Sequence, residues 1–492
     1  MREQFVYQIL QTFGFTPTPE QAHAADAFAG FMADREERVV MVLRGSAGTG
    51  KTTLAANIVK AMTALRQKLV LMAPTGRAAK VLSLYAGQPA YTIHRRIYRQ
   101  KTAGDLSAFS LNINLQRDTL FIVDEASMIS LDSGATALGG SIFGSGRLLD
   151  DLLSFVYNGA NCRLLLIGDS AQLPPVGEEE SPALRRDVLA AYGLKVYEAD
   201  LRQVLRQAGD SGILYNATRI RQQLEEYALP KIRFEGFNDI RVVKGDELIE
   251  QLATSYSRAG IDDTIVITRS NKRANIYNQG IRNTVLDRED ELCRGDQLMI
   301  VKNNYFWLQE ARNKEQENTP GMNTSLAASP LSLTPEFLAN GDVAVVQRVR
   351  NIHELYGLRF ADVTMTLPDY DDYELTATVL LDTLTSEAPA LTREQQEQLY
   401  IGVMEDYEDI RSKADRLKKL KQNPHYNAIQ VKFAYAVTCH KAQGGQWAHV
   451  YIDQGYMTDD MLTPDYLHWL YTAFTRATGH LFLVNWPATQ IE

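Results

Sequence analysis

Cysteine is scarce in this sequence, which has only 3 among its 492 residues. Cys162, Cys293 and Cys439 lie far apart, and none of them forms a C-x-x-C pair. An odd number of cysteines at this spacing argues against a disulfide framework and a thiolate zinc cluster. We interpret the three as reduced residues that contribute to packing.

Long apolar runs are missing as well. No run approaches the roughly 18 residues that a membrane-spanning helix needs. The first residues mix arginine, glutamate, glutamine and tyrosine, whereas a secretory signal would be continuously apolar. We therefore expect a cytoplasmic protein.

Positive charge is not in excess, because 51 lysines and arginines face 60 aspartates and glutamates, for a formal net charge of −9. The chain thus lacks the overall basic surface that often marks nucleic-acid-binding proteins, so any such contact must be local. It does have 45% apolar residues, which excludes intrinsic disorder as the main state. At about 150 residues per domain, the length predicts about three domains.

Short apolar runs rich in valine, isoleucine and leucine recur through the first part of the chain. Each is too short for a helix and ends at a cluster of turn-forming or polar residues, and helical stretches such as 53–66 lie between them. This pattern is typical of a parallel sheet with crossover helices, in which ligands collect at the carboxyl ends of the strands. The expected strands are 39–43, 69–73, 120–123 and 164–167.

Later runs predict a second α/β sheet built from distant segments, with strands at 264–268, 433–437, 449–452 and 481–484. The stretch between them, about 293–427, has a different pattern. Residues 313–335 are rich in asparagine, threonine, serine and proline, and short alternating strands are expected at 342–349 and 376–381. We expect a small β-barrel that carries a flexible loop.

The end of this insertion reverses charge sharply. Acidic residues at 405, 406, 408 and 409 are followed by basic residues at 411, 413, 416, 418, 419 and 421. We interpret the segment as a solvated helix with intrachain ion pairs, and a contact with nucleic acid is the alternative.

The sequence from Gly45 to Thr52, GSAGTGKT, satisfies the full phosphate-loop pattern G-x-x-x-x-G-K-[ST] between an expected strand and an expected helix. Such glycines let backbone N–H groups turn toward phosphates, Lys51 reaches the β- and γ-phosphates, and the Thr52 hydroxyl is suited to ligate magnesium. The expected nucleotide-binding residues are Gly45, Ser46, Ala47, Gly48, Thr49, Gly50, Lys51, Thr52 and Thr53.

A second acidic element follows at 121–127, where an apolar strand ends in two carboxylates. Asp124 is suited to hold magnesium through its water shell, and Glu125 is suited to activate the attacking water. Two adjacent carboxylates at a strand end favour hydrolysis over simple nucleotide storage.

Three further polar residues are candidates for the same site. Gln172, after the strand at 164–167, could reach the γ-phosphate. Arg206 and Arg476 are distant in sequence, and an arginine from across a cleft would stabilise charge on the transferred phosphoryl group. Spacing alone favours a surface ion pair for either arginine.

The order of the motifs resembles that of a superfamily 1 DNA helicase of the RecD/Dda type, the branch that moves 5′-to-3′. The resemblance extends from about Phe15 to Trp486. Its motifs are GSAGTGKTT, APTGRAAK at 73–80, YTIH at 91–94, VDEAS at 123–127, GDSAQLPPVG at 168–177, LRQ at 205–207, VTCHKAQGG at 437–445 and YTAFTRA at 471–477.

This resemblance implies an α/β fold with two RecA-like P-loop motor domains, with ATP and Mg²⁺ between them and single-stranded DNA across their top. The first motor domain is expected at 1–198, with a pin-like insertion at about 97–119, and the second at 199–292 and 428–492. An inserted SH3-like β domain is expected at 293–427, with its flexible loop at about 313–335.

The resemblance also implies roles for single residues. Gln21 resembles the glutamine that recognises adenine, Gln172 the γ-phosphate sensor, and Arg206 and Arg476 the arginines of the second motor domain. The residues that resemble DNA-facing positions are Pro74, Thr75, Thr92 and His94 in the first motor domain, and Thr438, His440 and Lys441 in the second.

The sequence departs from the family pattern in the pin, which is short here, with Phe109 as the candidate aromatic tip. It also departs at Gln446, where family members often have an acidic residue, and at the asparagine-rich loop. Single strands are held by backbone charge and by base stacking on aromatics, so a modest local channel suffices. Candidates for that channel are Arg95, Arg96, Arg99 and Lys101 with Tyr91 and Tyr98, whereas Trp447 and Trp469 are expected in the core.

The leading hypothesis is a monomeric, ATP-dependent DNA helicase that acts on single-stranded and forked DNA. A translocase that does not separate strands is the first alternative, because the pin segment is short. A nucleotide-gated nucleic-acid-binding module is the second, although Glu125 argues against it. No further carboxylate cluster with metal-ligand spacing suggests a built-in nuclease.

Overall fold

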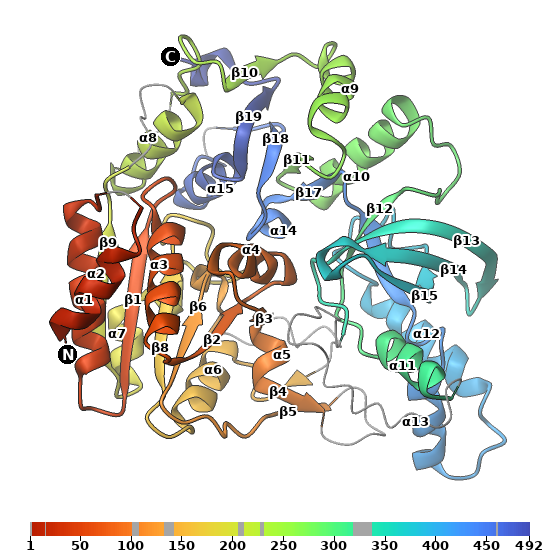
Figure 1. Cartoon of the computed structure of the whole chain (residues 1–492). Coiled ribbons are helices and arrows are strands. Elements are labelled where there is room, and N and C mark those ends of the chain that lie inside the picture. The colour runs from red at the N-terminus through yellow and green to blue at the C-terminus, as the bar shows by residue number, and fades with distance from the viewer. Residues whose placement is uncertain are drawn as a thin grey trace.

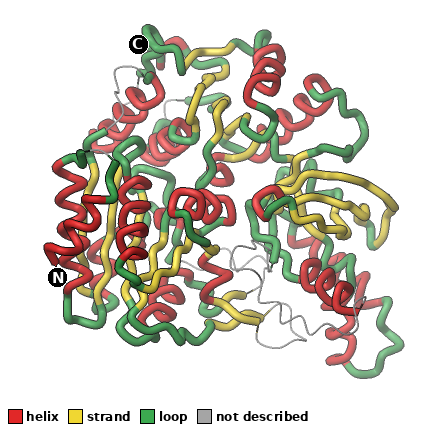
Figure 2. Tube along the Cα trace, viewed as in Figure 1, coloured by secondary structure: helices red, strands yellow, loops and turns green. Residues whose placement is uncertain are grey.

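Two parallel sheets and a closed barrel form the framework of the chain (Figure 1). The computed structural model describes residues 2–492 except 15, 101–107, 132–141, 205–210, 227–230, 318–336 and 459–460. Figure 2 shows the strands of the first sheet with helices packed along them. Within the described residues, no helix is both long enough and apolar enough to span a membrane.

The first sheet has six strands, all paired in parallel. Their spatial order is β3 (Ala90–Thr92), β2 (Lys68–Ala73), β6 (Thr119–Val123), β8 (Arg163–Gly168), β1 (Val39–Gly45) and β9 (Lys195–Leu201). Four of these strands contain the runs predicted from the sequence. Their carboxyl ends share one edge, so the residues that follow β1, β6 and β8 lie close together.

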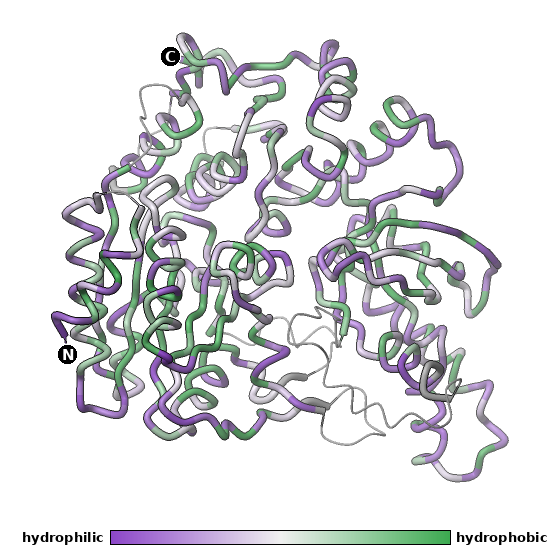
Figure 3. The backbone as a smooth tube through the Cα atoms, in the orientation of Figure 1, coloured by the Kyte–Doolittle hydropathy of each residue, from purple (hydrophilic) through white to green (hydrophobic). Residues whose placement is uncertain are grey.

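Helices cover both faces of this sheet, as crossover connections require. One face packs against α1 (Arg2–Gln11), α2 (Pro19–Ala33), α3 (Lys51–Ala64) and α4 (Gly76–Ala86). The other packs against α5 (Ile93–Ile97), α6 (Leu148–Tyr157) and α7 (Arg186–Ala191). Figure 3 shows hydrophobic residues along the strands between these layers.

The predicted pin segment contains a small separate sheet. Strands β4 (Tyr98–Gln100) and β5 (Ala108–Leu111) pair antiparallel, and β5 also pairs with β7 (Ile142–Phe143). Phe109 lies on β5 opposite Gln100, so the backbone of this segment has the hairpin pairing expected from the resemblance.

The second sheet has five parallel strands. In spatial order these are β10 (Ile240–Val243), β19 (Ala477–Val484), β18 (Trp447–Asp453), β11 (Thr264–Thr268) and β17 (Ala436–Thr438). One face packs against α8 (Gly212–Glu226), α14 (Cys439–Ala442) and α15 (Pro464–Phe474). The other packs against α9 (Leu248–Ala259) and α10 (Asn271–Gly280), which continues as a π-helical turn at Ile281–Val285.

The inserted region forms a closed barrel of five strands, which confirms the predicted β-barrel. The strands are β12 (Gln297–Ile300), β13 (Val343–Leu355), β14 (Leu358–Leu367), β15 (Tyr373–Leu380) and β16 (Ile429–Phe433). The second-sheet strand predicted at 433–437 is wrong in part, because Phe433 ends β16 of the barrel and only β17 joins the sheet. The chain turns between them at Tyr435, whose buried hydroxyl bonds Asp296.

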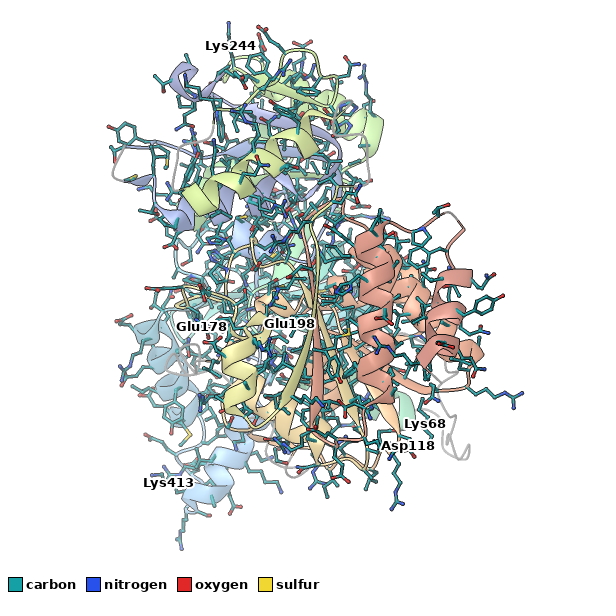
Figure 4. The ribbon with its side chains drawn as sticks, turned by 90° about the vertical axis from the view of Figure 1, so that its left-hand side faces the viewer. Lys68, Asp118, Glu178, Glu198, Lys244 and Lys413 are labelled. Carbon is teal, nitrogen blue, oxygen red and sulfur yellow. The ribbon has the colours of Figure 1, made fainter. Side chains whose placement is uncertain are left out.

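Three helices accompany the barrel: α11 (Phe306–Glu317), α12 (Arg393–Glu405) and α13 (Lys413–Gln422). Helix α11 includes the first residues of the loop predicted at 313–335, and the rest of that loop lies outside the described residues. Lys413, at the start of α13, points away from the molecule at the lower end of Figure 4.

The basic half of the charge-reversed segment forms helix α13, whose side chains are mostly exposed to solvent, as predicted. Among the residues that the structure describes, Arg411, Lys413, Lys418 and Lys419 have no carboxylate within ion-pair distance. Leu420 holds α13 against a small apolar cluster shared with α12 and β14. Apolar packing at Leu420 therefore attaches this helix to the rest of the inserted region.

The predicted fold class is confirmed by the two parallel sheets and the inserted barrel. The exact domain limits remain a proposal. We propose the same division into two motor domains and an inserted β domain, with β16 counted as part of the barrel. The three cysteines are free thiols; Cys162 and Cys439 are buried, whereas Cys293 is partly exposed.

Candidate functional site

The phosphate loop connects the end of β1 to the start of α3. Gly48 and Gly50 have φ angles of 77° and 81°, in the region that favours glycine. A Cβ atom on Gly45 would lie 2.8 Å from the Lys51 side chain and 2.8 Å from the Thr49 hydroxyl. Gly48 and Gly50 therefore need glycine for their backbone angles, and Gly45 needs it because a side chain would collide with Lys51 and Thr49.

Lys51 lies inside this loop at the first turn of α3. Its Nζ donates to the Gly45 carbonyl at 2.5 Å and lies 3.9 Å from the Asp169 carboxylate. Thr49 donates its hydroxyl to the Ser46 carbonyl at 2.8 Å and stiffens the loop. The ammonium group is therefore fixed at the carboxyl edge of the first sheet.

Asp124 and Glu125 follow β6 at the same edge. The Asp124 carboxylate accepts from the Glu125 N–H at 2.9 Å, and Glu125 has a left-handed φ of 52°. A non-glycine residue in this region is strained, and such strain is concentrated at functional sites. Burial, followed by the charge of Glu125, raises the pKa of Asp124 to about 6.

Three buried polar atoms of residues predicted to bind the nucleotide have no hydrogen-bond partner in the structure. They are Ser46 Oγ, Gln172 Oε1 and Gln21 Nε2. The other end of the Gln21 amide caps α2, where Oε1 accepts from the Thr18 N–H at 3.1 Å. Because buried polar groups are normally paired, these three atoms fit a polar ligand in this site. A nucleotide carries the acceptors and donors that they lack.

The donor set at the loop also fits a magnesium ion. Thr52 and Asp124 offer a hydroxyl and a carboxylate, and Mg²⁺ prefers oxygen ligands. A cation beside Asp124 would offset the cost of a buried negative charge next to Glu125.

Helix α15 of the second motor domain reaches this edge, although no role was predicted for its residues. The Tyr471 hydroxyl accepts from the Ala47 N–H at 2.9 Å and donates to Asp169 at 2.6 Å. The Leu173 N–H donates to the Thr472 hydroxyl at 2.7 Å, and His468 Nδ1 lies 2.9 Å from the Ala171 carbonyl. The motif at 471–477 signals this helix, but only the fold reveals what it touches.

A polar cleft of about 750 Å³ separates the two motor domains beside these contacts. Ser46, Gln172 and Asp169 line one wall, and Arg221 and His468 line the other. The two halves of the chain thus meet around the phosphate loop and leave space next to it.

The two predicted arginines are not brought to the phosphate loop. Arg206 lies outside the described residues. Arg476 is 3% exposed and donates to the carbonyls of Thr472 and Gly445 and to the Thr475 hydroxyl, all within the second motor domain. A role for Arg476 at the nucleotide remains a prediction and requires a change in these bonds.

The predicted DNA-facing residues of the first motor domain lie at the starts of two helices. The Thr75 hydroxyl accepts from the Ala78 N–H and caps α4, and the Thr92 hydroxyl accepts from the Arg95 N–H and caps α5, both at 3.2 Å. Pro74 precedes Thr75 at the end of β2. These hydroxyls have a structural use, whether or not they also contact DNA.

His94 lies in the first turn of α5, with its ring 5.6 Å from the ring of Tyr98. Burial lowers the pKa of His94 to about 4, so the ring is neutral near pH 7. A contact from this side chain would therefore depend on hydrogen bonding or stacking rather than on charge.

The DNA-facing residues predicted in the second motor domain begin α14. Gly444, just beyond this helix, packs on the first motor domain, since a Cβ there would lie 3.1 Å from the Thr75 hydroxyl. Lys441 donates to Asn340 of the barrel, and burial lowers its pKa to about 8. His440 is exposed and Thr438 is half-buried. The segment after α14 thus contacts the first motor domain at Thr75, one of the predicted DNA-facing residues.

Trp447 and Trp469 are 4% and 6% exposed, so their predicted place in the core is confirmed. Trp447 also contacts the other motor domain, because the Arg77 guanidinium lies 4.1 Å from its ring centre and donates to the Gln446 carbonyl. The side chain of Phe109 lies outside the described atoms.

These features define the class of the protein. A complete phosphate loop, an acidic strand end at the same sheet edge, and a second parallel sheet whose helix α15 touches the phosphate loop and the segment after β8 make a P-loop protein with two RecA-like motor domains. Among the described residues no cluster of three or more His, Cys, Asp or Glu side chains is arranged to bind a metal.

Comparison with known proteins agrees with this class. Residues 32–178 match the model of an AAA domain, and residues 433–484 match that of a UvrD-like helicase C-terminal domain. The chain is 32% identical over 198 residues to the ATP-dependent RecD2 DNA helicase of Deinococcus radiodurans, covering 40% of this chain and 23% of that one. It is 24% identical over 286 residues to the ATP-dependent DNA helicase dda of Enterobacteria phage T4, covering 54% and 57%.

Among solved structures, the chain is similar to the Pif1 helicase from Bacteroides in complex with ADP-AlF3 and single-stranded DNA. The match has 14% identity and a TM-score of 0.46, and it covers 97% of this chain and 94% of that one. The chain spans about a quarter of the RecD2 helicase and just over half of the dda helicase. The domain matches and these two relatives confirm the resemblance to superfamily 1 helicases of the RecD/Dda type.

Proposed function

We propose that this protein is an ATP-dependent DNA helicase that moves 5′-to-3′ along single-stranded DNA and unwinds duplex DNA. The observation that carries the proposal is the contact of helix α15 of the second motor domain with Ala47 of the phosphate loop and with Asp169 beside Lys51, at the strand edge that also bears Asp124 and Glu125. A phosphate site built between two motor domains suits a motor, because closure of the cleft then depends on the nucleotide. Both halves belong to one chain, so a monomer suffices.

In this proposal, Lys51 and the N–H groups of residues 46–52 hold the phosphates, and Thr52 and Asp124 hold Mg²⁺. Glu125 orients and deprotonates the attacking water, and Gln172 senses the γ-phosphate by donating from its amide nitrogen to a phosphate oxygen. Gln21 donates its free Nε2 hydrogens to the adenine. Arg206 and Arg476 stabilise the transferred phosphoryl group when the cleft closes.

The proposed DNA path follows the seam between the motor domains on the side of α4, α5 and α14. Pro74, Thr75, Thr92 and His94 supply one side of this path, and Thr438, His440 and Lys441 supply the other. Arg95, which lies 5.0 Å from the Tyr91 ring, and Arg99 provide local positive charge. Phe109 on β5 is the proposed wedge that splits the duplex.

The test is ATP hydrolysis with and without single-stranded DNA, together with unwinding of forks that carry only a 5′ or only a 3′ loading tail. Stimulation with unwinding from the 5′ tail alone supports the proposal. Hydrolysis that DNA or RNA fails to stimulate contradicts it and favours a nucleotide-gated binding module.

A translocase that leaves the duplex intact is the second candidate. The observation in its favour is the size of the pin sheet, whose strands β4 and β5 have 3 and 4 residues. Stimulated hydrolysis that leaves both forks intact would favour this function. Displacement of a protein bound to the single strand would then measure movement directly.

A further inference from the structure

Tyr471 is a buried bridge between the two motor domains. It lies on α15, is 1% exposed, and contacts two different motifs of the first motor domain. Its hydroxyl oxygen accepts from the Ala47 N–H of the phosphate loop at 2.9 Å. The same hydroxyl donates to Asp169, after β8, at 2.6 Å.

The direction of these bonds follows from the protonation of the phenol. Burial, with Asp169 as the next cause, raises the pKa of Tyr471 well above its usual value. The hydroxyl therefore stays protonated near neutral pH and donates a hydrogen bond to the Asp169 carboxylate. Its lone pairs remain available for the Ala47 N–H.

Asp169 extends the bridge to the phosphate-binding lysine. Its Oδ2 atom, which accepts from Tyr471, also lies 3.9 Å from Lys51 Nζ. The Ala171 N–H donates to Oδ1 of the same carboxylate at 3.1 Å and holds it in place. A continuous path thus runs from α15 through Tyr471 and Asp169 to Lys51.

We propose that Tyr471 is a positioning residue, and that its hydroxyl couples phosphate binding at the loop to the position of the second motor domain. Phosphate oxygens need the loop N–H groups and the Lys51 ammonium. In this geometry the Ala47 N–H is directed at Tyr471, while Lys51 donates to the Gly45 carbonyl and lies 3.9 Å from Asp169. A bound triphosphate competes for these donors and weakens the hydrogen bond between the loop and Tyr471 on α15. The inference rests on the proposed function, because it concerns the same nucleotide site.

This competition has a thermodynamic consequence. A ligand shifts the arrangement of two domains only by the difference in its affinity for the two arrangements, and the coupling between two ligands is reciprocal. If the Tyr471 hydroxyl is the source of this difference in affinity, the affinity for DNA depends on whether a triphosphate or a diphosphate is bound.

The chain offers a matched control on the same helix. Tyr466 is 2% exposed, and its hydroxyl donates to Gln454 at 2.7 Å, inside the second motor domain. Tyr471→Phe and Tyr466→Phe each delete one buried hydroxyl from α15. Only the first deletes a bond between the domains.

The experiment measures the affinity of a fluorescent oligothymidine in the presence of AMP-PNP or ADP. Couplings of this kind are typically about 5- to 150-fold. We expect the ratio of the two affinities in Tyr471→Phe to lie within about 2-fold of 1, with the wild-type ratio kept in Tyr466→Phe. A wild-type ratio in Tyr471→Phe overturns the inference, and thermal unfolding of both variants checks that they fold.

A second readout omits DNA and keeps the inference distinct from the proposed function. Loss of a competing acceptor is expected to strengthen AMP-PNP binding relative to ADP in Tyr471→Phe, but not in Tyr466→Phe. An unchanged ratio of AMP-PNP to ADP affinity also overturns the inference.

If the wild-type protein does not bind DNA, the proposed function fails while this nucleotide ratio still tests Tyr471. Tyr471→Met replaces Tyr471→Phe if the latter does not fold.

Discussion

Two edges meet at the nucleotide cleft, and they are built differently. On the first motor domain, the loop from Gly45 to Lys51 and the pair Asp124 and Glu125 are fixed by the backbone at strand ends. On the second, Tyr471, Thr472 and His468 reach across as side chains of one helix. The difference indicates that the first edge is defined by local backbone geometry, whereas the second depends on contacts between side chains and residues distant in sequence.

The largest expected effect comes from the edge on the first motor domain. Glu125→Gln removes the proposed base and keeps the size of the side chain, and general-base catalysis is typically worth about 10²- to 10⁴-fold. We expect kcat for DNA-stimulated ATP hydrolysis to fall by at least about 100-fold. A steady-state phosphate-release assay measures it.

Nucleotide binding is the control for this variant. Fluorescent ATP-analogue binding by Glu125→Gln is expected to stay close to that of the wild-type protein. A variant that still hydrolyses ATP at the wild-type rate would remove Glu125 from the mechanism.

The next effect tests the edge on the second motor domain. Thr472→Val removes the acceptor of the Leu173 N–H and leaves it buried without a partner, which costs about 1–3 kcal/mol. Because this bond joins the two motor domains, we expect a lower Tm and also a changed KM for ATP. Differential scanning fluorimetry and steady-state kinetics give the two values.

Thr383→Val is the matched variant for this comparison. Thr383 is equally buried, and its hydroxyl accepts from the Val431 N–H at 3.1 Å inside the barrel region. Its loss is expected to lower Tm without changing KM. Equal changes in KM for both variants would show that the position of the lost bond does not matter.

The sequence predicts the two edges to different extents, for physical reasons. The phosphate loop is local, so its pattern of glycines, Lys51 and Thr52 defines both geometry and chemistry. Tyr471 meets Ala47 at a separation of 424 residues, and no periodicity reports such a pair. The motif at 471–477 predicts that this helix lies near the site. It singles out the charged Arg476, whose hydrogen bonds stay within the second motor domain, rather than Tyr471, which crosses between the domains.

The same reasoning applies to the strands. The run at 264–268 coincides with β11, because one buried parallel strand gives one apolar run. The run at 433–437 spans the end of β16 and the start of β17, which belong to different sheets. The sequence shows them as one apolar run because both strands are buried. The turn between them depends on the bond from Tyr435 to Asp296, which has no signature in the sequence.

A third prediction concerns the contact between the barrel and the first motor domain. Asp342 is buried against Gly76, with Oδ1 unpartnered and Oδ2 accepting from the Ala339 N–H and the Tyr370 hydroxyl. Burial raises its pKa from 3.8 to about 7. The folded state therefore holds this proton more tightly than the unfolded state, so stability is lost as the pH rises from 3.8 to about 7, and the loss is complete above that range.

Asp342→Asn removes this charge and keeps the shape of the side chain. We expect the variant to have a higher Tm than the wild-type protein at pH 8, and the difference to shrink as the pH falls through 7 to 5.5. Thermal unfolding across this range measures it. A difference in Tm that is independent of pH would mean that Asp342 does not titrate there.

The smallest effect compares two basic surfaces, one beside the predicted DNA seam and one on α13. Arg95 and Arg99 lie at the seam, whereas Lys418 and Lys419 are exposed on the distal helix without carboxylate partners among the described residues. Each phosphate contact on a single strand contributes about 0.7 to the slope of log affinity against log salt.

We expect the double variant Arg95→Ala with Arg99→Ala to reduce that slope by the amount that one to two phosphate contacts contribute. We expect Lys418→Ala with Lys419→Ala to leave the slope unchanged. A reduced slope in the lysine pair would instead favour a contact of α13 with nucleic acid. The measurement is oligothymidine binding at several salt concentrations, and it separates a solvated helix from a second DNA surface because the two pairs carry the same charge.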